Sequence, residues 1–435
     1  MVKKLLVVFI AFALLFSLAA CNAPNTGSNT NNNTSNTPAP ANTDKSSDKP
    51  VTVTMYHTMV QEVKQKGLKV LQDEFTKQYP NVTFKNVVYN QGTDYFQQLQ
   101  TALASGDQPE IMMGNPGLYT DLINNGFVMD LSNNSVLKNL GLSKGDLSEM
   151  TVDGKLYAFP IDFKTWGVFY NVKMFRDLNL KVPTTHSEML KVCQTLADAG
   201  IDPWIDAYGD GVYGDIQVRA TVWPRALAAG DVDFFEKVMS GEKTVYDYDY
   251  VREGISVWKD RMQWHRNDAI SNGQDQSLEL FAAGAGAMMF QGTWAVGDLL
   301  SYIGDKDFEF DFFVVPIDEN PNSQKLNIMV DQCFMINPKS DAADQALKFL
   351  EYWITDGALT WSEMTNMPLC SGKSSDKLLP MVKTIASIKA SGNIAHYGDF
   401  TKPFNTEFTA CKSYGLCPQT LNGARRHFSI PHYRI

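Results

Sequence analysis

Short apolar runs alternate with longer amphipathic stretches through the first third of the chain. Val51 to Tyr56 alternates apolar and polar residues as a half-buried strand does, and Val82 to Tyr89 and Glu110 to Met113 predict two further strands. Between these strands, apolar residues recur at helical spacing: Val60, Leu68, Leu71 and Phe75 before Pro80, then Phe96, Leu99 and Leu103 before Ser105-Gly106. Strands that alternate with helices pair in parallel through right-handed crossovers. The pattern therefore predicts an α/β domain.

A second sheet is predicted to begin near residue 160. Pro160 cannot donate a ladder hydrogen bond, whereas Gly167 to Tyr170 is apolar enough to form a core strand. We therefore expect the chain to cross between two domains between Pro160 and Trp166. Beyond this crossing, the pattern predicts a helix from Ser187 to Ala199, a strand near Ile201 and a helix that opens at Trp223-Pro224.

The stretch from Phe281 to Trp294 has the clearest pattern in the second half of the chain. A helical run ends near Phe281, two glycines loosen the chain, and Ala287 to Phe290 reads as a buried strand that stops at Gln291-Gly292. In open α/β sheets, ligands bind at the carboxyl ends of the strands. Trp294 stands at such an end, so it is either a ligand contact or a core aromatic, one of eight tryptophans in the chain.

Two more strands and a helix complete the pattern. Phe308 to Val315 predicts a strand that ends at Pro316, and Leu326 to Ile336 predicts one that leads back to the first sheet. Asp341 can then cap a helix. The apolar face of this helix follows a 3.6-residue period: Ala343, Ala346, Leu347, Leu350, Trp353 and Ile354.

Residues 1 to 21 have the pattern of an export signal. Lys3-Lys4 is a positive start, Leu5 to Phe16 is an apolar run too short to span a bilayer comfortably, and Leu18 to Ala20 form a small-residue cleavage site. Cleavage would leave Cys21 first, and Leu-Ala-Ala-Cys resembles the lipobox of bacterial lipoproteins, in which this thiol is acylated. A plain signal peptide with an incidental cysteine is the alternative.

Residues 22 to 50 are a low-complexity run of Asn, Thr, Ser, Pro and Ala. The run has too few apolar residues to offset the entropy of ordering a chain, which predicts a disordered tether.

About 385 residues follow this run, enough for two domains. Without Lys3 and Lys4 the chain has a net charge of about −12, which argues against nucleic acid as a partner. The cysteines after Cys21 are odd in number and scattered, unlike a disulfide framework.

The sequence contains no strong catalytic or cofactor motif. Gly209 to Gly214 matches the dinucleotide fingerprint as a string, but no clear strand precedes it and no amphipathic helix begins at its last glycine, so we interpret it as a loop. There is no Walker lysine loop, His-Glu-x-x-His pair or Gly-x-Ser-x-Gly elbow, and the six histidines are dispersed. We therefore expect no cofactor, no metal and no enzyme, although a carboxylate pair for glycoside hydrolysis stays open.

Taken together, the segments resemble the extracellular solute-binding proteins of ATP-driven importers, in the branch of maltose-binding and other sugar-binding lipoproteins. The resemblance rests on the order of several segments: Cys21, Thr54 to Pro80, Gly106 to Ile111, Phe159-Pro160, Tyr170 to Lys173, Phe281 to Trp294, Val314 to Pro316, and Ala346 to Trp353. It implies a two-lobed, type II periplasmic-binding-protein-like α/β fold with hinge crossings and a ligand cleft between the lobes. The implied lobes are residues 51–160 plus 328–365 and residues 161–327 plus 366–435.

The resemblance also implies a function. The protein would be a monomeric lipoprotein on the extracytoplasmic face of the cell membrane that passes a carbohydrate, expected to be an oligosaccharide, to permease subunits. The implied ligand contacts are Tyr56, His57 and Asn115 on the first rim, Asp162 and Lys164 near the crossing, Trp223 and Trp294 on the second lobe, and Asp331 at the return crossing. A cell-surface carbohydrate enzyme and a lectin-like adhesion module are the alternatives.

The composition changes after about residue 410. No acidic residue follows Glu407, and Gln419 to Ala424 lacks the amphipathic period with which family members usually close. We hypothesise that the reading frame departs near Ala410.

Overall fold

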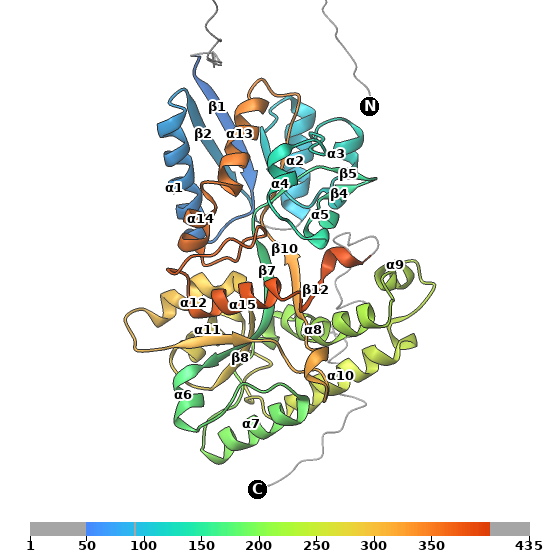
Figure 1. Ribbon diagram of the computed structural model, residues 1–435, viewed down its shortest axis with the longest axis vertical. Helices are drawn as coiled ribbons and strands as arrows, with labels where there is room; N and C mark the ends of the chain where they lie inside the picture. Colours follow the sequence, from blue (N-terminus) through green and yellow to red (C-terminus); the bar gives the residue numbers. More distant parts are fainter. Residues whose placement is uncertain (1–48, 91–92, 401–435) are drawn as a thin grey trace, which may run out of the picture. The chain divides into compact units, whose positions relative to one another are not determined.

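The computed structural model describes residues 49–90 and 93–400, and Figure 1 shows how their helices and strands are arranged. The expected signal peptide, the lipidation site Cys21, nearly all of the expected tether and the atypical tail after about residue 410 lie outside the described residues.

The first sheet contains five strands in the order β2-β1-β3-β11-β6. Their bounds are β1 (Val51–His57), β2 (Val82–Val88), β3 (Ile111–Met113), β6 (Phe159–Pro160) and β11 (Cys333–Ile336). The strands β1, β2 and β3 are parallel, as the alternation of strands and helices predicts. The strand β11 pairs antiparallel with both β3 and β6, so the sheet is mixed. Pro160 lies in the edge strand β6, where a missing N–H is tolerated.

Helices cover both faces of this sheet. The helices α1 (Glu62–Gln78), α13 (Ala343–Ile354) and α14 (Ala358–Thr365) pack in one core with Val53 and Met55, whereas α2 (Thr93–Ser105) packs in another with Tyr56 (Figure 1). Successive side chains of a strand point to opposite faces, which separates these residues of β1. Shorter elements complete this part: η1 (Pro116–Leu118), α3 (Thr120–Asn124), α4 (Ser135–Asn139), α5 (Lys144–Glu149), β4 (Thr151–Val152) and β5 (Lys155–Leu156).

The second sheet has the order β12-β10-β7-β8, with β9 also paired to β7. Its strands are β7 (Phe163–Asn171), β8 (Met288–Gly292), β9 (Phe310–Phe313), β10 (Leu326–Val330) and β12 (Ile394–His396). The strand predicted at 287–290 thus continues to Gly292, which pairs with Trp166. The strand predicted at 326–336 is two strands in different sheets, because the chain leaves the second sheet after Val330 and enters the first at Cys333.

The helices around the second sheet include one that the sequence misplaced. They are α6 (Val172–Asp177), α7 (His186–Asp198), α8 (Val212–Ala228), α9 (Phe234–Met239), α10 (Asp249–Met262), α11 (Gln274–Ala282), α12 (Val296–Ile303) and α15 (Pro380–Ala390). The helix predicted to open at Trp223-Pro224 is α8, which begins at Val212 and holds Pro224 in its interior. Because Pro224 lacks an N–H, the carbonyl of Ala220 is left without its helical partner, and Asn327 Nδ2 donates to it over 3.2 Å.

Two further expectations in this region are wrong. The strand near Ile201 is absent, since Trp204 makes only isolated bridges to His265 and Met288. The Gly209 to Gly214 segment is not entirely a loop, because η2 (Tyr208–Asp210) leads into α8 two residues before Gly214.

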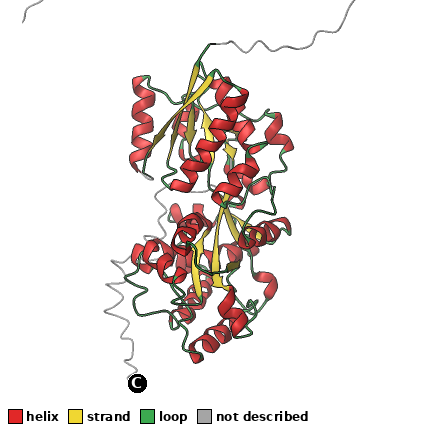
Figure 2. Cartoon of the chain, turned by 90° about the vertical axis from the view of Figure 1, so that its left-hand side faces the viewer, coloured by secondary structure: helices red, strands yellow, loops and turns green. Residues whose placement is uncertain are grey.

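The chain passes between the two sheets at three places, and Figure 2 shows the strands as two groups, each flanked by helices. The passages lie between Pro160 and Phe163, between Val330 and Cys333, and between the end of α14 at Thr365 and the start of α15 at Pro380. In the third passage, Leu369 bridges to Asp162 in the first.

Candidate carbohydrate-binding site

A cavity of about 950 Å³ is bordered by residues from both sides of the crossings. Gln61 just before α1, Lys64 of α1 and Leu118 of η1 line one side, and β7, α8, α11, η4 (Thr293–Ala295) and the end of β10 contribute most of the rest. The full lining is Gln61, Lys64, Leu118, Lys164, Trp166, Asp210, Val212, Tyr213, Asp215, Ile216, Arg219, Gly273, Gln274, Asp275, Gln276, Trp294, Met329 and Asp331.

Aromatic side chains form one wall of this cavity. Trp294 follows β8 and is partly exposed, while Trp166 on β7 is 4% exposed. Their ring centroids are 6.4 Å apart and their planes are inclined by 51°. Tyr213 of α8 stands beside Trp294, with its hydroxyl 3.4 Å from the indole nitrogen. The wall therefore offers apolar ring surface to a ligand.

Two lysines flank one carboxylate at the crossing side of the cavity. Asp331 Oδ2 lies 3.0 Å from Lys64 Nζ, and Asp331 Oδ1 lies 3.1 Å from Lys164 Nζ. Burial alone would raise the pKa of Asp331, but the two ammonium groups outweigh burial and hold that pKa below its usual range. Asp331 also holds the pKa of Lys164 above its usual value, against the opposing effect of burial. Asp331 and Lys164 are therefore both charged at neutral pH.

A second ion pair lies on α8. Asp215 and Arg219 are one helical turn apart and their side chains contact each other. Asp215 Oδ1 is buried and has no hydrogen-bond partner among the described residues. Burial raises the pKa of Asp215, and the guanidinium of Arg219 opposes this shift. The site thus holds a carboxylate oxygen able to accept a hydrogen bond.

Of the residues expected to contact ligand, Trp294, Lys164 and Asp331 line the cavity and Trp223 and Asp162 do not. Trp223 is fully buried, with its ring 5.3 Å from Trp166 and stacked 5.2 Å from Tyr397. The expected position of Trp223 on the cleft surface is therefore wrong, because it sits in the interior face of α8.

Asp162 holds the crossings together instead of facing the cavity. It is fully buried, its Oδ1 accepts from the Gln332 backbone N–H over 2.9 Å, and its Oδ2 accepts from Trp361 Nε1 over 2.7 Å. Burial raises the pKa of this carboxyl, and the nearby Asp331 adds to the shift. Its hydrogen bonds join the first two passages of the chain to α14.

The three residues expected on the first rim do not line the cavity. Tyr56 is 5% exposed, and burial, helped by a hydrogen bond with Tyr89, raises its pKa to about 12. His57 Nδ1 accepts from the Met59 N–H over 3.3 Å, and burial lowers the pKa of His57 to about 4. Asn115 caps η1 by accepting from the Gly117 N–H over 2.9 Å.

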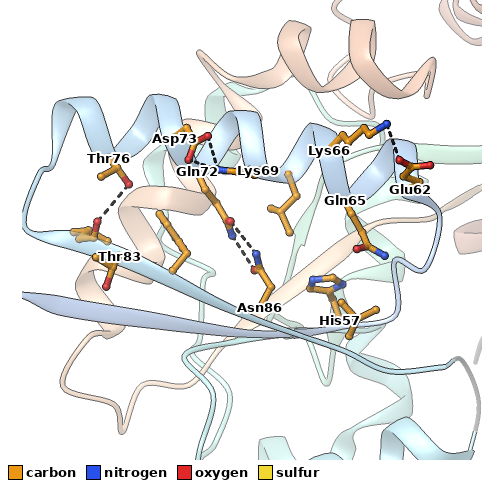
Figure 3. Close-up of a pocket in the computed structure, with 14 residues that line it drawn as sticks. His57, Glu62, Gln65, Lys66, Lys69, Gln72, Asp73, Thr76, Thr83 and Asn86 are labelled. Atoms are coloured by element: carbon orange, nitrogen blue, oxygen red, sulfur yellow. Dashed lines mark hydrogen bonds and ion pairs between the residues drawn. The ribbon is translucent and has the colours of Figure 1, made fainter.

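His57 instead lines a groove of about 680 Å³ between α1 and β2, drawn in Figure 3. The polar side chains of this groove are largely paired with one another. Lys66 contacts Glu62 and Lys69 contacts Asp73, each at 2.7 Å, and the amides of Gln72 and Asn86 exchange two hydrogen bonds of 2.9 Å (Figure 3). Since these groups already satisfy one another, we place the candidate site in the larger cavity.

Comparison with known proteins gives the family. The model of the family described as "Bacterial extracellular solute-binding protein" matches residues 61–359. This chain belongs to that family. Its members are solute-binding receptors rather than enzymes, which agrees with the resemblance found in the sequence. None of the helices in residues 49–90 and 93–400 has both the length and the hydropathy to cross a membrane.

Relatives and solved structures align with this chain over 42% to 86% of its length. The "Multiple sugar-binding protein" of Streptococcus mutans is 25% identical over 86% of this chain and 88% of its own length. An "Alpha-glucosides-binding periplasmic protein" of Rhizobium meliloti is 27% identical over 42% of each chain. The solved structure of RafE with raffinose has a TM-score of 0.66 at 19% identity, and covers 86% of this chain and 98% of that one. The type II two-lobed fold is thereby confirmed.

Several residues of the solute-binding protein's cavity were not found from the sequence. They are Lys64, Trp166, Tyr213, Asp215, Arg219 and Gln274. The spacing of Asp215 and Arg219 at i and i+4 was available as a signal, but the sequence placed the start of their helix near Trp223. Among the described residues, no group of three or more His, Cys, Asp or Glu side chains is arranged to hold a metal.

Proposed function

We propose that this protein is the substrate-binding lipoprotein of an ABC importer, which captures an oligosaccharide outside the cell and delivers it to membrane permeases. The observation that carries the proposal is the aromatic wall of Trp294 and Trp166 in a cavity that is also lined by polar and charged residues. Relatives named for multiple sugars and α-glucosides, and a neighbour solved with raffinose, support the same class of ligand.

The chemistry of the cavity suits a neutral sugar. The C–H face of a pyranose packs against an aromatic ring, while its hydroxyls need hydrogen-bond partners. Trp166 Nε1 is a buried donor and Asp215 Oδ1 a buried acceptor, and neither has a hydrogen-bond partner among the described residues. Both residues line the cavity, and a ligand hydroxyl that reached either atom would give it a partner.

We assign the ligand contacts to Trp294 as the stacking platform and to Lys164 and Asp331 as polar partners at the crossing side. The parts on either side of the passages act as two lobes that close over the ligand. The hydrogen bonds of Asp162 hold the passages of the hinge together. Lys164 and Asp331 have one another as partners, so a ligand hydroxyl adds to an existing hydrogen-bonded cluster.

The proposal extends to the anchor and the partners. Acylated Cys21 holds the protein on the extracytoplasmic face of the membrane. The polar residues 22–50 are the linker between this anchor and the part of the chain that binds ligand. The receptor is a monomer with no cofactor, and it hands its sugar to two permease subunits. A genomic neighbourhood that encodes two permeases distinguishes this receptor from an adhesion module.

Titration calorimetry with a panel of neutral oligosaccharides tests the proposal, together with analysis of each sugar after long incubation. A receptor binds one or more sugars at micromolar concentrations and returns them unchanged. Shortened sugars in the incubation would instead favour the carbohydrate enzyme. An absence of heat with every sugar in the panel would refute the proposed ligand class.

A further inference from the structure

Three side chains from separate elements meet at the edge of the Trp294 ring. Trp294 Nε1 donates to Gln274 Oε1 over 3.2 Å, and the Tyr213 hydroxyl donates to the same oxygen. Gln274 is the first residue of α11, Tyr213 lies in the first turn of α8, and Trp294 lies in η4. One amide oxygen therefore accepts from the indole and from the phenol together.

The position of Gln274 is itself fixed. Its backbone N–H donates to Asp210 Oδ2 over 2.6 Å, which ties the start of α11 to η2. Tyr213 is 3% exposed, so its ring is held by packing. The two groups that contact the indole N–H are thus supported by elements that do not include the loop after β8.

The other side of the indole is fixed by Gly292. A Cβ at this position would lie 2.1 Å from Trp294 Cζ3, so the ring lies directly over the backbone at the end of β8. The φ angle of Gly292 is −112°, which any residue can adopt, so the glycine is required by the close approach of the ring and not by backbone conformation. The indole is held between this backbone and the Gln274 amide.

These contacts act on orientation more than on stability. The indole N–H of a partly exposed tryptophan would otherwise bond to water, so the net gain from the Gln274 bond is small. A side chain that is already ordered, however, loses no rotamer freedom when a ligand packs on it. The hydrogen bond from Trp294 to Gln274 should therefore affect the affinity for ligand more than the free energy of unfolding.

We propose that Gln274, with Tyr213, is a positioning residue that holds the Trp294 indole in the orientation that receives the sugar. The inference rests on the proposed function, because it concerns the same cavity. It adds a specific claim: affinity depends on a glutamine that acts through the tryptophan and not through a contact of its own with the sugar.

The test compares Gln274→Met in the wild-type background and in the Trp294→Ala background. In the wild type, Gln274→Met should weaken sugar binding about 10-fold with a nearly unchanged melting temperature. Tyr213→Phe, which keeps the ring and removes the donor, should weaken binding about 3-fold. In the Trp294→Ala background, Gln274→Met should have no further effect. An equal loss in both backgrounds, or a loss that follows a fall in melting temperature, would overturn the proposal.

A second readout needs no sugar. The fluorescence of Trp294 is obtained by subtracting the spectrum of Trp294→Phe, and Gln274→Met should shift this component to the red and increase its quenching by acrylamide. An unchanged component would overturn the positioning role even if sugar binding is found. If the wild type binds no saccharide but Gln274→Met shifts the Trp294 fluorescence to the red, the proposed function is wrong. The conclusion that Gln274 orients Trp294 is then still supported.

Discussion

Lys164 in β7 and Asp331 just beyond β10 form an ion pair of 3.1 Å at the point where both strands approach the other sheet. Lys64 of α1 contacts the second oxygen of the same carboxylate at 3.0 Å. A single carboxylate thus joins residues from both parts of the chain. The charge balance of this cluster should control the stability of the unliganded protein.

Asp331→Asn should lower the free energy of unfolding by about 3 kcal/mol, because it leaves two partly buried ammonium groups without their counter-charge. The measurement is urea denaturation at pH 7. Glu62→Gln, which breaks the exposed pair with Lys66, is the matched control and should change little. Since the folded pKa of Asp331 is depressed, its contribution is complete above the unfolded pKa of about 4 and decreases as the pH falls below it. A loss of equal size at pH 3 and pH 7 would contradict this assignment.

Trp294→Ala should weaken sugar binding by about 2 kcal/mol, or about 30-fold in Kd, because it removes the apolar platform. The melting temperature of the unliganded protein should hardly change, since Trp294 is only partly buried.

Trp223→Ala is the matched control for this prediction. Trp223 is fully buried, so its loss should cost about 3 to 5 kcal/mol of stability through the cavity left behind. Calorimetric titration and thermal unfolding measure both variants. A large fall in melting temperature for Trp294→Ala with intact affinity would place Trp294 in the core.

Glu149→Gln should reduce the pH dependence of folding stability. Glu149 is 1% exposed, its Oε1 accepts from the Val330 N–H over 3.1 Å, and its Oε2 has no partner among the described residues. Burial raises the pKa of this carboxyl well above its usual range. A raised folded pKa gives stability that is complete below the unfolded pKa of about 4 and is lost as the pH rises through the folded pKa.

The stability of the wild type minus that of Glu149→Gln should therefore fall as the pH rises above about 4, as measured by denaturant unfolding at each pH. Glu279→Gln, at an exposed position of α11, should give a curve parallel to the wild type. If the difference for Glu149→Gln is the same at every pH, the carboxyl titrates alike in the folded and unfolded chains.

Cys21→Ser should release the protein into the medium. The net negative charge of the chain does not favour an anionic membrane, so under the proposed function acylation of this thiol would supply the attachment. Fractionation of cells after a salt wash measures the distribution. Recovery of the serine variant in the membrane fraction would exclude the lipoprotein proposal.

The sequence predicted most of the strands because alternation and apolar runs are local properties. It failed where a local rule was overridden by packing. Pro224 was taken to open a helix, but the side chain of Asn327 satisfies the carbonyl that the proline frees, so α8 continues through it. The run from 326 to 336 was read as one strand although the polar pair Asp331-Gln332 interrupts it, and this pair is where the chain passes from one sheet to the other.

The candidate site was predicted less well than the fold. Trp294 was identified because it follows a clear strand. Trp223 was misplaced because a tryptophan in a helix has no local feature that distinguishes a cavity wall from a core. Asp215 and Gln274 depend on which faces of α8 and α11 turn toward β8, and that rotation is set by contacts distant in the sequence.

The hydrogen bond from Asn327 to Ala220 has a mechanical consequence. It ties the middle of α8 to β10, the strand that leads directly into the return passage. The first half of the same helix carries the cavity residues Tyr213, Asp215 and Arg219. In the lobe closure proposed above, a rotation of that passage would therefore act on α8 through this hydrogen bond. By freeing the Ala220 carbonyl, Pro224 thus supplies the acceptor through which the cavity-lining helix is hydrogen-bonded to the strand that leads to the crossing.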